Sequence, residues 1–518
     1  MAIKIDKEHR LFRNELIFTP QATRIRLENT LVNLFMLLKN NGSKAKARVG
    51  RGDITVEKVK KQFLKFDSDG RTIGAVENEQ VVEWWLKNNL LNLVYRGKEQ
   101  ESVASLRPIH INSFVIRNAK QTRDHNSSEQ VYLMLKSDPV KEELTKFLGL
   151  GWDDIANQLA TQDMLDVDSL GVLRLASITR ANSDGKELVQ HVSPLLPAQA
   201  KLFCDDIHRI LQYQHVIPRQ VMMEYIKVLT GFHLGLYSMG LIENLAAMVQ
   251  EGSLEKVKPI SYVLDLTDDP ASQVAQFAVE DAARYYDGLN DYIRSTFLIN
   301  TALRFQRADF GNSASLPPAL ELLSNPTVDF LAWCRAKADH LVDSVEEEDR
   351  TLLEEILAFE DNPLDQYIEL ILKSRFKFHY RYNVQMLDAF TQKNSEEGFL
   401  AQGRSRKHPR RFVMGSKLLE VLIQILVLRQ GEMGFYSEPL SIEQLIGLLR
   451  DRYGMIINGL NEPRFSGADV QTHQAFKENL EAFKHKLRNI GFYNVLSDAY
   501  IMQKIRPRYP IGEGAAHS

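Results

Sequence analysis

The chain has 518 residues, of which 44% are hydrophobic and 25% are charged, and its 64 basic and 67 acidic side chains give a net charge of −3. These proportions are typical of globular proteins and argue against collagen-like, disordered and membrane-embedded classes. At about 150 residues per domain, the length predicts roughly three domains, each long enough to bury its own core.

The charge is unevenly distributed along the chain. Residues 1–138 carry a net charge of +8, residues 139–402 carry −17, and residues 403–518 carry +6. Two basic ends around an acidic centre indicate nucleic-acid contact at the ends and a partner-binding surface in the middle. The alternative is segregation by chance, or charges that cancel between packed domains. We take the three ranges as the predicted domains.

Cysteine content and apolar stretches bear on the compartment. Cys204 and Cys334 are too few for a disulfide framework or a cysteine-based zinc module, and they fit a reducing cytosol. Residues 1–13 are charged and lack the apolar stretch of a secretory signal. The longest apolar stretch, 221–249, contains four ionisable residues, so a membrane span there would be costly. We predict a cytoplasmic protein with no membrane partner, and a buried helix pair over 221–249.

The first block predicts a basic α+β domain. Apolar residues at helical spacing indicate helices over 23–39, 55–66 and 78–91. Segments 108–117 and 130–136 look like strands that are joined by a turn-rich connection. Helices followed by a hairpin are compatible with a winged-helix-like unit or with a simple α+β domain.

The middle block predicts an acidic, irregular helical domain. Its helical pattern is interrupted by Gly- and Pro-containing breaks, and its one convincing strand is 260–266. No fixed repeat is present, which disfavours a regular helical solenoid.

The last block has the clearest pattern. A helix over 416–429 is apolar nearly all round, which predicts that it is buried. Ser441 and Gln444 form a capping box that begins a second helix, and Gly454 ends that helix. A third helix over 471–490 presents one apolar face.

Two short β-like segments, 492–496 and 500–505, follow the third helix and predict a hairpin. Three helices and a two-stranded wing are the order of a winged helix. The fold class is therefore predicted as mainly α and multi-domain, with an α+β N-terminal domain, a helical centre, and a basic linker before a C-terminal winged helix.

Basic side chains in the two end blocks are candidate phosphate ligands, because neutralised phosphates dominate the affinity of proteins for DNA. The third helix and the wing offer Lys477, Lys484, Lys486, Arg488, Lys504, Arg506 and Arg508. The preceding tract offers Arg404, Arg406, Lys407, Arg410 and Arg411. The first block offers Lys44, Lys46, Arg48 and Arg51. The alternatives are a winged helix used for protein contact and an ordinary solvated lysine face.

Tests for enzyme motifs fail. The fragment 184–187 lacks both the first glycine and the hydroxyl of a Walker A loop. Cys204 and His208 are four residues apart on a predicted helix, but no second ligand pair accompanies them. We predict no catalytic residue, no metal and no cofactor, although a catalytic site assembled from distant residues stays open.

Three fragments, 262–270, 282–286 and 411–414, resemble helical accessory proteins of bacterial methylation-associated anti-phage defence systems. Phosphorothioation-dependent restriction systems are a looser analogue. The resemblance implies a non-catalytic component that works beside an ATP-dependent translocase and separate nuclease or methyltransferase subunits.

The leading hypothesis is an accessory or scaffold subunit that binds nucleic acid, with DNA as the expected partner, through its basic ends and binds defence-complex proteins through its acidic centre. Two alternatives remain. One is a cryptic metal-dependent nuclease or hydrolase whose acidic residues collect magnesium. The other is a winged-helix transcription regulator.

Overall fold

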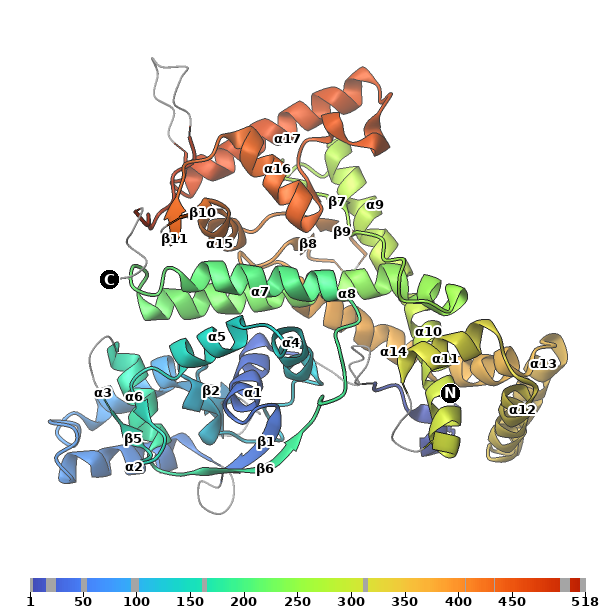
Figure 1. The fold of residues 1–518 in the computed structure, drawn as a ribbon, viewed down its shortest axis with the longest axis horizontal. Helices are drawn as coiled ribbons and strands as arrows, with labels where there is room; N and C mark the ends of the chain where they lie inside the picture. The colour runs from blue at the N-terminus through green and yellow to red at the C-terminus, as the bar shows by residue number, and fades with distance from the viewer. Residues whose placement is uncertain are drawn as a thin grey trace.

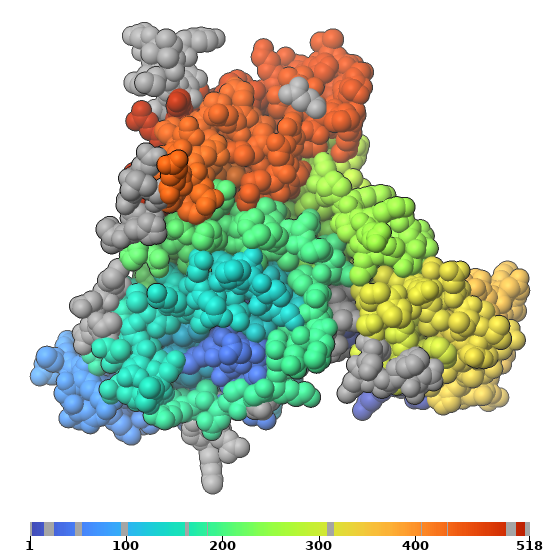
Figure 2. Space-filling model, viewed as in Figure 1, coloured from blue at the N-terminus to red at the C-terminus, as the bar shows by residue number. Residues whose placement is uncertain are grey.

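A computed structural model describes residues 3–14, 25–47, 54–94, 102–160, 165–310, 315–405, 407–432, 434–493 and 504–512. Two long helices, α7 (Pro197–Leu211) and α8 (Arg219–Glu251), cross the middle of the molecule, with an N-terminal body on one side and a C-terminal body on the other (Figure 1). A helical arm projects from one end, so that the surface shows three lobes (Figure 2). The mainly α fold is confirmed.

The N-terminal body combines helices with two-stranded ribbons. Its elements are α1 (Leu27–Lys39), β1 (Ser43–Ala47), α2 (Val56–Ser68), α3 (Glu79–Trp85), β2 (Leu91–Val94), β3 (Ser102–Leu106), α4 (Ser127–Leu135), α5 (Val140–Leu148), β4 (Trp152–Asp153), β5 (Gln158–Leu159), α6 (Val167–Ala176) and β6 (Ala181–Glu187). The antiparallel pairs are β1 with β6, β2 with β3, and β4 with β5. Strand β6 thus belongs to the N-terminal body, although it lies beyond position 138, where the predicted basic domain ends.

Helix α8 is buried on nearly every side because all three lobes pack against it. It contacts α1 and α4 of the N-terminal body, α10 and α14 of the arm, and α15 of the C-terminal body. Glycines allow the closest approaches: a Cβ on Gly231 would lie 2.6 Å from Leu27 Cδ1, and one on Gly235 would lie 2.9 Å from Phe399 Cζ. One contiguous apolar core therefore runs through all three lobes.

The arm is purely helical, and the first residues of the chain pack into it. A strand, β7 (Tyr262–Val263), and helix α9 (Gln273–Asp287) lead to the arm helices α10 (Leu289–Phe310), α11 (Leu316–Ser324), α12 (Val328–Asp343), α13 (Glu347–Phe359) and α14 (Pro363–Phe390). The Phe12 ring stacks on His379 of α14, with centroids 4.1 Å apart, and His9 Nδ1 lies 2.8 Å from the Tyr367 hydroxyl. Most of residues 3–14 thus pack on the arm (Figure 1), whereas Arg13 pairs with Glu129 of α4 in the N-terminal body at 3.1 Å.

The C-terminal body contains β8 (Leu400–Gln402), β9 (Arg410–Phe412), α15 (Ser416–Leu426), β10 (Leu428–Gly431), β11 (Gly434–Ser437), α16 (Ile442–Tyr453), β12 (Met455–Ile456) and α17 (Val470–Asn489). Strand β12 pairs in parallel with β7, which joins this body to the middle of the chain. The Ser441–Gln444 capping box at α16 is confirmed, as is the left-handed Gly454 that ends the helix. The predicted wing falls mostly on residues 494–503, which lie outside the described residues.

Two strands predicted in the first block are wrong. Residues 130–135 lie in α4, where they are all buried, and Lys136 caps the end of that helix. A short apolar run without a period cannot distinguish a strand from a helix that is buried all round. Residues 111–115 form a 3₁₀ turn instead, in which His110 Nδ1 accepts a hydrogen bond from the Asn112 amide at 3.1 Å. Local side-chain hydrogen bonds displace the strand there, so the hairpin expected for a winged-helix-like N-terminal block is absent.

Three further predictions need correction. The pair of helices expected over 221–249 is the single helix α8, because its glycines serve close packing rather than a turn. The helix predicted over 416–429 ends at Leu426, and β10 follows it. The tract expected to be a basic linker is the loop of a hairpin, because β8 and β9 pair on either side of it. The strand predicted over 260–266 is present, but only over Tyr262–Val263.

A buried polar network fastens the C-terminal body to the central helices. Asp206 of α7 is fully buried and accepts hydrogen bonds from Arg452 and, at 2.7 Å, from the Tyr453 hydroxyl of α16. His233 Nε2 of α8 lies 3.0 Å from the same carboxylate. Burial alone would raise the pKa of Asp206, but the hydrogen bond from His233 and the charge of Arg452 outweigh it and lower this pKa. We assign the cluster to structure, since its carboxylate is wholly enclosed and paired.

Candidate nucleic-acid interface

One flank of α17 carries a row of basic side chains. Asp469 caps the helix by accepting a hydrogen bond from the Thr472 amide at 2.8 Å. Phe476, Phe483 and Leu487 then point into the core. Residues three, four and seven apart share a helix face. Lys477, Lys484 and Arg488 therefore form a row on one flank of the helix, about a quarter-turn from that apolar face, which we call the α17 ridge. Lys477 is exposed, and Lys484 and Arg488 are half-buried.

The side chains on and near the α17 ridge differ in their partners. Lys477 is exposed and has no ion pair among the described residues. Lys484 pairs with Glu481 at 2.7 Å, and the Arg488 guanidinium lies 5.4 Å from the Tyr493 ring centroid. Lys486 faces the other side of the helix.

Lys486 contributes to a different part of the C-terminal body. The pKa of Glu396 is lowered chiefly by the hydrogen bond that its carboxylate accepts from the Ser416 amide, and the charge of Lys486 adds to this effect. Lys486 therefore interacts through its charge with Glu396, an exposed residue that precedes β8.

The segment 504–512 meets the C-terminal end of α17. Ile505 bridges to Leu440, and the Arg508 guanidinium donates to the Ile490 carbonyl at 3.1 Å. Arg508 is exposed and also pairs with Glu420 at 2.9 Å, so its charge is already engaged within the chain. Lys504 and Arg506 are exposed and have no ion pair among the described residues. They extend the positive surface beyond the α17 ridge.

The β8–β9 hairpin divides its predicted basic residues into two groups. At its base, the Arg410 guanidinium grips the Asp388 carboxylate with contacts of 2.8 and 3.0 Å and lies over the Tyr286 ring. Arg411 pairs with the buried Asp265 at 2.9 Å. In the loop, Arg404 and Lys407 are exposed, and Arg406 lies outside the described residues. Only the loop therefore presents its charge to solvent.

Internal partners engage several basic side chains of the first block. Lys44 and Lys46 are both exposed, and Lys44 pairs with Glu129 at 2.9 Å. Lys60 on α2 is only 7% exposed and bridges three carboxylates, at 3.1 Å from Glu57, 2.8 Å from Glu79 and 2.8 Å from Glu83. The hydrogen bonds that Lys60 donates to these glutamates raise its pKa. Arg48 and Arg51 lie outside the described residues.

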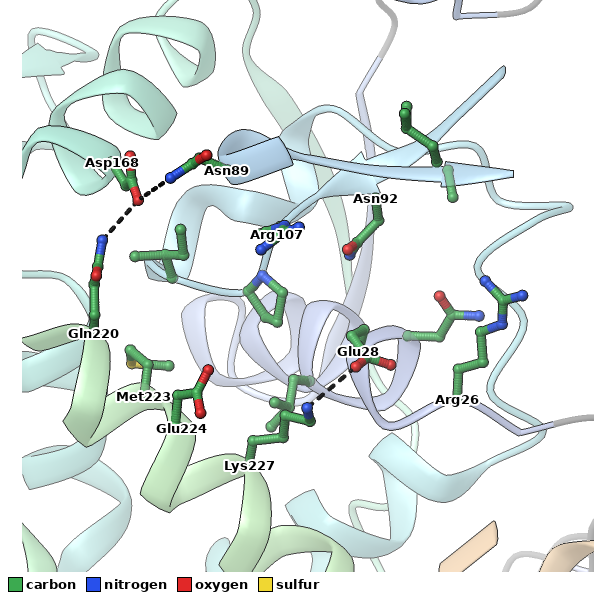
Figure 3. A pocket seen from close by; sticks show the side chains of 16 residues that line it. Arg26, Glu28, Asn89, Asn92, Arg107, Asp168, Gln220, Met223, Glu224 and Lys227 are labelled. Carbon is green, nitrogen blue, oxygen red and sulfur yellow. Dashed lines mark hydrogen bonds and ion pairs between the residues drawn. The ribbon is translucent and has the colours of Figure 1, made fainter. Parts of the chain in front are cut away.

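A polar cavity of about 440 Å³ lies between the N-terminal body and α8 (Figure 3). On one wall, Asp168 accepts hydrogen bonds from Asn89 at 3.1 Å and Gln220 at 2.7 Å. On another, Lys227 of α8 pairs with Glu28 of α1 at 3.4 Å. The lining is balanced between the two charge signs and comes from separate segments of the chain, which is why no sequence pattern marks it.

The described residues contain one group of metal-ligating side chains. Ligand atoms of Glu8, His9 and His340 lie within 4.8 Å of one another. The Glu8 carboxylate already has cationic partners, since Lys337 lies at 3.3 Å and Arg304 at 3.5 Å. We assign this group to the docking of residues 3–14 on the arm.

Neither cysteine is placed as a nucleophile or as a zinc ligand. Burial raises the pKa of both Cys204 and Cys334 to about 12, so the thiolate is disfavoured. Cys204 donates to the Met134 carbonyl, whereas His208 contacts Glu143, so the two side chains have separate partners.

Among the described residues, no helix combines the length and apolar composition needed to cross a membrane.

A comparison with protein families decides the relationship of the whole chain. Residues 7–509 match the family described as methylation-associated defense system protein MAD7. The chain belongs to this family. The resemblance inferred from the three sequence fragments is thereby confirmed, and the protein is a component of a methylation-associated defence system. A search of curated proteins found no match. Membership of the MAD7 family implies partner proteins of the same system.

Proposed function

We propose that the chain is a non-catalytic accessory subunit of its defence system that acts in the cytoplasm, holding DNA on the α17 ridge and partner proteins on the helical arm. The observation that carries the DNA role is the gathering of cations on one flank of α17 and in the segment that follows it. Lys477, Lys504 and Arg506 are exposed, and Lys484 and Arg488 are half-buried. From Lys477 to Arg488 the ridge extends about 16 Å at 1.5 Å per residue. Duplex DNA presents about nine phosphates over that length.

The arm supports the partner-binding half of the proposal. Glu347, Glu348 and Asp349 lie in the first turn of α13, where negative charge suits the helix dipole. Phe359 at the other end of α13 is 93% exposed. An acidic helix with an exposed aromatic side chain suits a basic protein surface that has an apolar pocket. An ATP-dependent translocase of the same system is the partner that we propose.

Salt-dependent binding tests the DNA role. Fluorescence anisotropy with a labelled duplex of about 25 base pairs is followed for the full chain between about 50 and 200 mM salt. Each lost phosphate contact reduces the slope of log K against log salt by about 0.9. The triple variant Lys477→Ala, Lys484→Ala, Arg488→Ala should therefore flatten the slope by about 2.7.

A matched control removes the same charge elsewhere. Lys146, Lys256 and Lys258 are exposed at other places on the molecule. Their triple alanine variant should keep the slope of the unmodified chain. The DNA role of α17 is wrong if the unmodified chain does not bind the duplex at about 50 mM salt, or if both triple variants weaken binding equally. Cleavage of the duplex by the isolated chain with magnesium would support the nuclease alternative instead.

A further inference from the structure

The middle of α14 differs in charge from the acidic block that contains it. Between Glu369 and Asp388 the chain has no acidic residue. The same stretch contains four cations and four aromatic residues, which alternate along the helix: Lys373, Arg375, Phe376, Lys377, Phe378, Tyr380, Arg381 and Tyr382. A charged, aromatic-rich stretch of this kind is unusual inside a block with a net charge of −17.

Helical geometry sorts these side chains into rows. Lys373, Lys377 and Arg381 are four residues apart, all three are exposed, and none has an ion pair among the described residues. The buried face of α14 contains His379 and Asn383 instead. The three cations thus form a continuous ridge about 12 Å long at 1.5 Å per residue.

An aromatic pair lies beside this cationic ridge and outside the core. Phe378 is 39% exposed, and its ring centroid is 4.5 Å from that of Tyr382, in an edge-to-face arrangement. The Arg375 guanidinium lies 4.3 Å from the Phe378 ring centroid. The second pair, Phe376 and Tyr380, packs against the core. Phe378 and Tyr382 therefore have ring surface that the fold does not use.

Positive charge accumulates further at the edge of this surface. Burial and the charge of Arg10 both lower the pKa of Arg375, which places the Arg10 guanidinium near it. The nearest acidic residues along α14 are engaged elsewhere: Asp365 and Glu369 pair with Arg294, and Asp388 pairs with Arg410. A polyanion approaching the ridge would meet no free carboxylate from α14 itself.

We propose that this face of α14 binds single-stranded DNA, with Lys373, Lys377 and Arg381 on the phosphates and with bases stacked on Phe378 and Tyr382. Proteins that hold single strands without sequence preference combine cations that follow the backbone with aromatic rings that stack on bases. This inference extends the proposed nucleic-acid role to a second surface, and it depends on residues different from those of the α17 ridge.

The experiment separates stacking from charge. Anisotropy of a labelled oligo-dT of about 15 nucleotides is measured with the full chain across the same salt range. The double variant Phe378→Ala, Tyr382→Ala should weaken binding at least about tenfold with an unchanged salt slope, because stacking is lost and phosphate contacts are kept. The triple variant Lys373→Ala, Lys377→Ala, Arg381→Ala should flatten the slope by about 2.1, at about 0.7 per contact on a single strand.

Matched controls exclude general effects of the substitutions. Trp84→Ala removes an exposed aromatic ring from α3 of the N-terminal body and should leave oligo-dT binding unchanged. The Lys146, Lys256, Lys258 triple alanine variant removes three charges away from α14 and should keep the slope. Circular dichroism melting curves show that each variant is folded before its affinity is compared. The same titration with unlabelled oligo-U as competitor measures whether RNA displaces oligo-dT from the α14 surface.

The possible results distinguish the two proposals. Failure of the chain to bind oligo-dT at about 50 mM salt, while duplex binding persists, overturns the α14 site and leaves the α17 role intact. Normal oligo-dT binding by the aromatic double variant also overturns it. Oligo-dT binding that is lost in the α14 variants and kept in the α17 triple variant supports the α14 site, even if the duplex does not bind.

Discussion

The two basic ends of the chain have similar net charges but different surfaces. In the N-terminal body, carboxylates from other elements engage cations: Lys60 bridges three glutamates, and Lys44 pairs with Glu129. In the C-terminal body, Lys477 and Arg506 have no ion pair among the described residues. Net charge counts side chains, whereas binding depends on those that remain available to solvent. The comparison therefore favours the C-terminal end as the DNA surface.

The largest expected effect compares the two ends directly. Removing the α17 ridge (Lys477→Ala, Lys484→Ala, Arg488→Ala) should weaken duplex binding about 50-fold at about 50 mM salt, since three phosphate contacts are lost. The double variant Lys44→Ala, Lys46→Ala should change it less than about twofold, because β1, which carries both residues, lies across the central helices from the α17 ridge (Figure 1). Anisotropy titrations measure both. Equal losses from the two ends would show that the comparison is wrong.

Arg410→Ala tests whether a basic residue at the hairpin base serves the fold rather than DNA. The substitution removes a two-pronged contact with Asp388 and the stacking on Tyr286, while Lys393 and Tyr286 still contact that carboxylate. We expect a loss of about 2 kcal/mol in the free energy of unfolding, measured with urea. The salt slope for duplex binding should stay unchanged. Lys407→Ala, in the loop, should instead leave stability unchanged.

Lys60→Met tests how much the ion pairs of Lys60 with three glutamates stabilise the N-terminal body. It should lower the free energy of unfolding by about 1–2 kcal/mol at pH 7, less than a fully buried pair, because the three glutamates are partly exposed. The hydrogen bond from Lys60 is the main reason that the pKa of Glu83 is lowered. The stability that the Lys60–Glu83 pair contributes is thus present above the ordinary glutamate pKa of about 4.3. It is lost as the pH falls through the lower pKa that Glu83 has in the folded chain.

The pH dependence of the Lys60 substitution follows from these directions. The pKa of Lys60 is raised in the folded chain. Titration of Lys60 itself therefore takes no stability away at any pH below about 10.4. The stability difference between the unmodified chain and Lys60→Met should therefore be constant from pH 6 to 9 and should shrink below about pH 4. Urea titrations across this range measure it. A difference that grew on acidification would contradict the assigned ion pairs.

The smallest expected effect sharpens the view of the α17 ridge. Glu481 pairs with Lys484 and is the acidic neighbour that reduces the positive potential there. Glu481→Gln should strengthen duplex binding about twofold, because an exposed pair of this kind contributes little and is readily exchanged for a phosphate. Glu443→Gln, an exposed acidic residue on α16, serves as the control. A weaker duplex affinity for Glu481→Gln would indicate that Glu481 positions the lysine.

The accuracy of the sequence predictions depended on the range of the interactions involved. The start of α16 was predicted because Ser441 and Gln444 satisfy each other's backbone amides within one turn. The segment 130–136 was predicted wrongly, since only its neighbours in space decide whether a short apolar run becomes a strand or a helix. Residues 3–14 gave no signal that they would pack on α14, because that contact spans more than 350 positions.

The sequence by itself determined the mainly helical fold, the capped helices of the last block, the segregation of charge and the resemblance to the defence family. These depend on composition and on patterns within a few residues. Only the tertiary structure decided which cations remain available. It engaged Arg410 with Asp388 and Arg411 with Asp265, and it left the α14 ridge and Lys477 of α17 exposed. The physical reason is that an ion pair requires two groups within about 4 Å, and the folded chain brings such groups together from distant positions.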